Sequence, residues 1–296
     1  MQNLHIEWFT LAIMFTVIYG GINFLYKLSA HHNLSSHKIV NVSAITVSII
    51  SLTIILITES SFSNFKMILF FALINSAFFG LGSIVKILAL KHIPTSFAFP
   101  ITKLNSVLLI IYAFFLFNDR PSPLQWTGIG ISIFVLAYIS FNVKSENKKK
   151  LKNKKQTIGL LFAILAAFST SISMLAGKYA STEVPKLNYM FISYSLVAFY
   201  TFAINKFIQR NAVTRTSNNR KKILKFGIII GVLNFAGYYL ILSAFAKGPL
   251  SLIQGISSNA FIIPVLLSVI FLKEKFTYKN AIVLILSILS ILLIKL

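Results

Sequence analysis

The chain of 296 residues has no cysteine and only six acidic residues. Without cysteine, neither a disulfide nor a thiolate metal site can form. The carboxylates all fall near the ends of apolar runs or between them, at Glu7, Glu59, Asp119, Glu146, Glu183 and Glu274. No apolar run contains paired carboxylates, a Ser–His pair or an HExxH motif. The sequence therefore predicts no catalytic residues, no metal, no cofactor and no enzymatic activity.

Histidine is also missing from the middle of the apolar runs. The five histidines, His5, His31, His32, His37 and His92, lie in loops or near the ends of runs. A proton-driven antiporter of cationic drugs usually needs a carboxylate inside the membrane, for which proton and drug compete. Neither this carboxylate nor a buried imidazole relay is present. The sequence therefore favours a neutral or anionic solute over a cationic drug.

Apolar residues dominate the composition. They make up 56% of the chain against 11% charged residues, so a water-soluble fold would lack the polar residues to cover its surface. Runs long enough to cross a bilayer as helices occur near 8–28, 38–57, 66–90, 93–117 and 123–142, and again near 158–178, 188–208, 223–246, 249–272 and 278–295. The sequence predicts an all-α, multi-pass protein of the cell membrane with ten transmembrane helices.

The net charge of +22 is distributed in short segments between the apolar runs. Cations in such places orient helices against a membrane, so we expect no nucleic-acid partner. Most Lys and Arg residues follow the first, third, fifth, seventh and ninth runs. The positive-inside rule then places both termini outside the cell.

The second half of the chain repeats the first. Lys66 through Ser132 aligns without a gap on Lys221 through Ser287, an offset of 155 residues that pairs Gly82 with Gly237. An odd number of helices per copy makes the two copies enter the membrane in opposite directions. The sequence thus predicts two inverted five-helix repeats, at 1–142 and 158–296, joined by a lysine-rich linker at 143–157. Such repeats are typical of transporters that alternate access between two sides.

The hairpins around the fourth and ninth runs carry a resemblance to a known family. The second half contains Ala246-Lys-Gly-Pro-Leu-Ser251, then Ile263-Pro264-Val265, then Leu272-Lys-Glu274-Lys-Phe-Thr277; the first half contains Ala89-Leu-Lys-His-Ile-Pro94, then Phe117-Asn-Asp119-Arg120, then Gln125-Trp126-Thr127-Gly128. With the ten runs and the duplication, the whole chain resembles the EamA-type, ten-helix members of the drug/metabolite transporter superfamily. It departs from their pattern where Leu109 matches Pro264, where Asp119 replaces glutamate and where Val283 matches Gly128. The resemblance implies transport of a metabolite or drug, and leaves the substrate open.

Substrates of such transporters bind near the midplane, where matching helices are interrupted by Gly or Pro. Pro100 and Gly255 form one such matched pair; kinking for packing alone is the alternative. Lys103 lies about 15 Å into its span, where an ammonium group requires a cavity, a partner or an anionic group of the substrate. Helical spacing places Phe99, Lys103 and Ser106 on one face, and their repeat mates are Gln254, Ser258 and Phe261.

Further polar residues occur at helical spacing on other runs. These are Tyr19 and Asn23 on the first, Asn75 on the third, and Asn234 and Tyr238 on the eighth. Each could line the cavity or bond neighbouring helices. Lys86 continues the Asn75 stripe close to a loop, where extension toward the headgroups is an alternative to substrate contact.

Together these observations predict a secondary transporter that works by alternating access. Its substrate would be a small neutral or anionic metabolite such as an amino acid, sugar or organic acid. A non-transporting membrane scaffold or sensor is the alternative. The expected partners are this small molecule and the lipid bilayer, and a homodimer remains open beside the monomer.

Overall fold

The computed structural model describes residues 7–93, 98, 101–146, 154–211, 220–272 and 278–296. These residues form helices and no strand. The first half contains α1 (Trp8–His31), α2 (Ser36–Thr58), α3 (Phe65–His92), α5 (Leu104–Phe117) and α6 (Pro123–Glu146). The second half contains α7 (Lys154–Glu183), α8 (Lys186–Asn211), α9 (Arg220–Lys247), α10 (Leu250–Ser258), the 3₁₀ turn η1 (Asn259–Phe261), α11 (Ile262–Leu272) and α12 (Tyr278–Lys295).

Seven of the described helical segments are long and apolar enough to cross a membrane. Shorter apolar helices occupy the positions of the fourth, fifth and tenth predicted spans. The ten-helix layout is therefore confirmed. The lipid-facing surface explains the composition, because large apolar side chains such as Leu56, Phe115 and Phe271 are exposed on the outside of the bundle.

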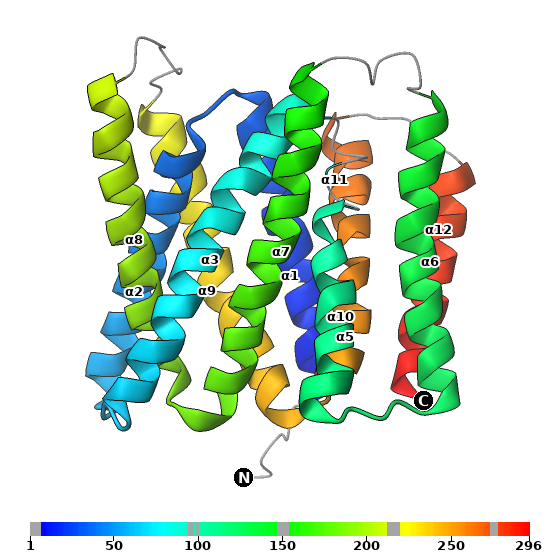
Figure 1. Cartoon of the computed structure of the whole chain (residues 1–296), viewed down its shortest axis with the longest axis horizontal. Coiled ribbons are helices and arrows are strands. Elements are labelled where there is room, and N and C mark those ends of the chain that lie inside the picture. The colour runs from blue at the N-terminus through cyan, green and yellow to red at the C-terminus, as the bar shows by residue number, and fades with distance from the viewer. Residues whose placement is uncertain (1–6, 94–97, 99–100, 147–153, 212–219, 273–277) are drawn as a thin grey trace.

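The two halves run in opposite directions. Figure 1 shows α1 starting at the end of the bundle where both termini lie, whereas α7 starts at the other end. Packing between the halves follows the same symmetry. α1 lies against α9 while α3 lies against α7, and α2 pairs with α8, α5 with α10, and α6 with α12. Each half thus supplies the partner for its counterpart, as two inverted repeats require.

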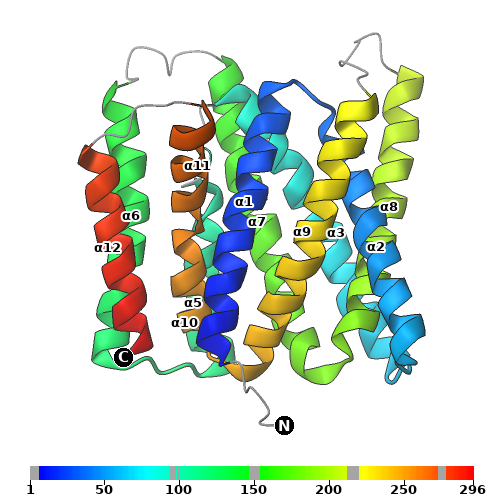
Figure 2. The same cartoon turned by 180° about the vertical axis from the view of Figure 1, so that it is seen from behind.

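The α6–α12 pair stands at one side of the bundle and the α2–α8 pair at the other (Figure 2). Helix α6 begins with a capping box: the backbone N–H of Ser122 donates to Gln125 Oε1 over 2.9 Å, and the N–H of Gln125 donates to Ser122 Oγ over 3.3 Å. Pro123 occupies the first helical position, where no N–H is needed. This local chemistry turns the chain back into the membrane after α5.

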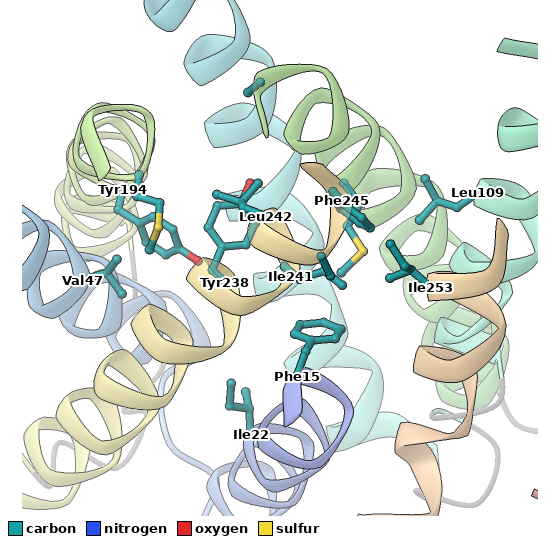
Figure 3. Packing of buried hydrophobic residues seen from close by; sticks show 14 of the residues in the cluster. Phe15, Ile22, Val47, Leu109, Tyr194, Tyr238, Ile241, Leu242, Phe245 and Ile253 are labelled. Carbon is teal, nitrogen blue, oxygen red and sulfur yellow. The ribbon is translucent and has the colours of Figure 1, made fainter. Parts of the chain in front are cut away.

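The main hydrophobic core lies between the two halves. Figure 3 shows Phe15 and Ile22 of α1 in the same interior region as Tyr238 and Leu242 of α9 and Tyr194 of α8. All five side chains are buried. A bundle whose core joins α1, α8 and α9 holds its two repeats together through side chains that lipid cannot reach.

The ninth membrane crossing is broken near its middle. The helix ends at Ser258, passes through η1 and resumes at Ile262. Pro264 explains the position, because proline lacks the N–H that would bond the carbonyl of Ala260 and its ring crowds that carbonyl. We expected the interruption at Gly255, and the structure instead places it after Ser258.

Candidate functional site: a donor-rich cavity between the repeats

A small cavity lies between the two halves, lined by Phe15, Tyr19, Ile22, Phe79, Thr170, Ser173, Met174, Tyr194, Asn234, Gly237 and Tyr238. These residues come from α1 and α3 of the first half and from α7, α8 and α9 of the second. The space open to the centre of a water-sized sphere is about 20 Å³, which holds about one water molecule. The cavity is therefore small in this conformation.

Lys86 on α3 points into the bundle beside this cavity. Its side chain is only 5% exposed, and its Nζ donates to Tyr19 Oη over 3.1 Å and to Asn23 Oδ1 over 3.2 Å. The same ammonium group lies 4.9 Å from the ring centroid of Tyr19 and 6.0 Å from that of Tyr26. Neutral dipoles and aromatic faces therefore surround the charge.

Lys103 lies between α5 and the broken ninth crossing. It is also 5% exposed, and its Nζ donates to the carbonyl of Ser257 over 2.8 Å. Ser257 is in the last turn of α10, where the helix dipole gives the carbonyls partial negative charge. The ammonium group also lies 5.1 Å from the ring centroid of Tyr19. Lys103 thus links the two halves at the point where the helix breaks.

A third set of polar groups joins α3 to the second half. Asn75 Oδ1 accepts hydrogen bonds from Ser173 Oγ over 2.6 Å and from Tyr238 Oη over 3.1 Å. The hydroxyl groups of Tyr238 and Tyr189 are 3.2 Å apart. Asn234 Nδ2 donates to Ser43 Oγ over 3.1 Å. These bonds fix the orientation of the hydroxyl and amide groups that face the cavity.

A fourth set lies along α10. Gln254 Nε2 is 3.8 Å from Met174 Sδ, and Gln254 Oε1 accepts from Ser257 Oγ over 3.0 Å. Ser258 Oγ donates to the carbonyl of Gly255 over 2.7 Å. Ser106 on α5 is buried, and its hydroxyl has no hydrogen-bond partner among the described residues. Met174 separates this set from the open part of the cavity, since it lines the cavity itself.

The EamA-like transporter family matches residues 6–141 and 157–296, which is nearly the whole chain. The chain belongs to the EamA-like transporter family. A relative from Archaeoglobus fulgidus, described as an uncharacterized transporter, is 23% identical over 216 residues, covering 73% of this chain and 72% of its own. One solved structure, described only as a crystal structure of a protein, shares the fold with a TM-score of 0.71, 14% identity, and coverage of 95% and 96% of the two chains.

Membership in the EamA-like family establishes a multi-pass transporter of the cell membrane. The predicted site residues of this EamA-like protein fall into three groups. Tyr19, Asn234 and Tyr238 line the cavity, and Asn23 and Asn75 bond to residues near it. Lys103, Ser106, Gln254 and Ser258 lie along the contact between α5 and α10. Phe99 and Pro100 are outside the described residues.

Gly255 is placed away from the cavity. A Cβ atom built on it would lie 2.9 Å from Ile294 Cδ1 and 3.2 Å from Ile129 Cγ1. Its carbonyl accepts bonds from Ser132, Ser258 and Asn259. The glycine therefore allows α6 and α12 to pack closely on α10, the alternative role that we considered for it.

Several residues beside the cavity are absent from the predicted site, among them Lys86, Ser173 and Tyr194. For Lys86, the sequence left open whether its ammonium group contacts substrate or extends toward the headgroups, because its flexible stem can reach either way. Ser173 and Tyr194 carry no signal beyond a polar atom within an apolar run. Lys86 is buried to the same extent as Lys103.

Asp119 joins the halves at the end of the bundle where the termini lie. Its Oδ2 accepts hydrogen bonds from the backbone N–H and from the Oγ of Ser251, both over 2.8 Å. Ser251 is in the first turn of α10, where free N–H groups and the helix dipole favour an anion. The repeat mate of Ser251 is Ser96, and that of Asp119 is Glu274. Both lie outside the described residues. Asp119 of the first half therefore caps a helix of the second.

Proposed function

We propose that this EamA-like transporter moves a small neutral or anionic metabolite, such as an amino acid, a sugar or an organic acid, by alternating access. The cavity that carries this proposal is enclosed by helices of both inverted halves. A site shared by two inverted repeats is exposed to one side or the other when the repeats rock against each other. The Asp119–Ser251 contact supports this mechanism, because it links the halves at one end.

The charges near the cavity support the substrate class. Lys86 and Lys103 are buried cations. The acidic side chains that the structure describes, Glu7, Glu59, Asp119 and Glu183, all lie at helix ends. A cationic substrate would meet like charge in the interior without a carboxylate to receive it. Transport then proceeds by facilitation, by exchange, or with proton coupling through Lys103. We expect no catalysis.

Flux through the purified protein tests the proposal. Proteoliposomes loaded with a panel of amino acids, sugars and organic acids should show counterflow of at least one radiolabelled solute. Gly237 lines the cavity, so Gly237→Leu should fill the space and abolish this flux. Gly130→Leu is the matched control, because a Cβ built on Gly130 meets nothing within 4 Å.

Melting temperatures of both variants show whether the substitution affects folding rather than passage. Flux that is equal in Gly237→Leu and Gly130→Leu contradicts a pathway through this cavity. Absence of flux for every solute, together with co-purification of a stable protein partner, supports the scaffold or sensor instead.

A further inference from the structure

The polar groups around Tyr19 include more hydrogen-bond donors than acceptors. Both ammonium groups, of Lys86 and Lys103, lie within about 5 Å of the Tyr19 ring centroid, so they are near one another. An ammonium group has three N–H donors. In the described part of the chain, Lys86 bonds to two side-chain oxygens and Lys103 to one carbonyl. The hydroxyl proton of Tyr19 has no acceptor there either.

The two lysines differ in what balances their charge. Lys103 meets the carboxyl end of α10 through the carbonyl of Ser257, so a helix dipole compensates it. Lys86 contacts a phenol oxygen and an amide oxygen, both uncharged. No carboxylate of the described residues forms an ion pair with it. A buried cation without a negative partner is costly, so Lys86 is the cation that a ligand would stabilise most.

Tyr194 supplies an independent observation at the cavity itself. It lines the cavity and is 1% exposed. Its hydroxyl is buried and has no hydrogen-bond partner among the residues that the structure describes. Its ring packs against those of Phe79 and Tyr238, with centroids 5.2 Å and 5.7 Å away. A buried hydroxyl without a partner is destabilising, which indicates that its acceptor arrives with a ligand.

We propose that Lys86 and Tyr194 bind the carboxylate of a compact organic acid, and that Lys103 instead holds α10 in place. The inference rests on the proposed transport function and narrows its substrate class from neutral or anionic to anionic. A carboxylate accepts several hydrogen bonds at once and provides the negative charge that Lys86 lacks. Phe15, Ile22 and Phe79 line the same cavity and offer contact to an apolar body of the acid.

Matched acids and amides test the charge requirement. The full-length protein in lipid nanodiscs is titrated with phenylacetate and phenylacetamide, and with isovalerate and isovaleramide, while its melting temperature is recorded. Each amide has nearly the shape of its acid without the charge. We expect the acids to raise the melting temperature and to bind at least about tenfold more tightly than the amides, because hydrogen bonds to a charged group are the strong ones.

Lys86→Met should reduce the ratio of acid affinity to amide affinity to about one. Lys86→Arg should retain most of the preference for the acid. Lys66→Met is the matched control, since Lys66 lies exposed on the same helix; it should keep the preference. Tyr194→Phe should stabilise the free protein and weaken its binding of the acid. Removing an unpartnered hydroxyl should raise the melting temperature of the free protein, while acid binding weakens by about tenfold.

Several outcomes overturn the proposal: equal binding of acids and amides, no binding of any acid, or an acid preference that survives Lys86→Met. A lower melting temperature of free Tyr194→Phe would also contradict it, because that hydroxyl would then have a partner. Flux measurements distinguish a failure of the proposed anion site from a failure of the proposed transport function. Counterflow of an amide with no preference for the acid overturns the anion site and leaves transport standing. Acid-selective binding without any flux overturns transport and leaves the anion site standing.

Discussion

One oxygen atom of Asn75 connects the two halves of the bundle. Its Oδ1 accepts from Ser173 on α7 and from Tyr238 on α9, while Asn75 itself belongs to α3. All three side chains are buried. Removing the acceptor takes away the side-chain partner of the Ser173 hydroxyl and leaves the Tyr238 hydroxyl with that of Tyr189, so this residue contributes more than its own hydrogen bonds.

Asn75→Ala should lower the free energy of unfolding by about 1 to 3 kcal/mol, allowing about 0.6 to 1.7 kcal/mol for each interhelical hydrogen bond in a membrane protein. Thermal or denaturant unfolding in detergent measures this value. A double-mutant cycle with Tyr238→Phe provides the control. The second substitution should cost clearly less in the Asn75→Ala background. Strict additivity would contradict the shared bond.

At the scale of residues, the sequence predicted how deep a side chain lies in the membrane better than it predicted which way that side chain points. Lys103 was recognised because it lies in the middle of a span, and the structure buries it. Its partner, the backbone carbonyl of Ser257, was not predicted. Backbone carbonyls carry no sequence signature. Lys86 was ambiguous because its flexible stem allowed two directions, and Tyr194 was missed because packing selects which tyrosines face a cavity.

At the scale of elements, helix contacts depend on small residues that periodicity does not reveal. Helix α9 packs on α2 at Gly227 and Gly231, a G-x-x-x-G spacing. A Cβ built on Gly227 would lie 2.5 Å from Val42 Cβ, and one on Gly231 would lie 2.5 Å from Thr46 Cβ and 2.9 Å from the carbonyl oxygen of Ser43. The backbones can approach this closely only without side chains.

Gly231→Ala should therefore destabilise the protein by about 1 to 3 kcal/mol, because α2 and α9 must separate to admit the methyl group. Gly130→Ala is the matched control on α6, where the surrounding space is open. There the added methyl group should be neutral or stabilising by up to about 1 kcal/mol, through helix propensity alone. The melting temperatures of the two variants in the same detergent measure the contrast, and equal values would contradict the close contact.

The break in the ninth crossing also belongs to this scale. The repeat predicted both spans of the helix-four and helix-nine pair, and the interruption was expected at Gly255. The structure places it at η1. Proline acts on the turn before it, so Pro264 marks the break more directly than Gly255. The repeat alone did not indicate this, because Leu109 stands at the matching position in the first half.

At the scale of the whole molecule, the two ends of the bundle differ in charge. Apart from Glu146, the last residue of α6, the described acidic residues lie where α1 begins and where α2, α5 and α7 end. Figure 1 shows these helix ends on the side of the termini. The start of α7, with Lys154 and Lys155, lies at the opposite end. By the positive-inside rule we expect this opposite end to face the cytoplasm.

Cysteine labelling tests the orientation without background, since the chain has no cysteine. Lys155→Cys and Thr182→Cys place single thiols at exposed positions near the two ends of α7. A membrane-impermeant maleimide should label Thr182→Cys in intact cells, and label Lys155→Cys only after permeabilisation. The reverse pattern would show that the termini face the cytoplasm.

The narrowness of the cavity has a consequence for every binding measurement. With space for about one water molecule, this cavity must widen before it admits a metabolite. The apparent dissociation constant is then the intrinsic one divided by the fraction of molecules in the wider form. A substitution far from the ligand, such as one that loosens the Asp119–Ser251 contact, would change apparent affinity through this fraction alone.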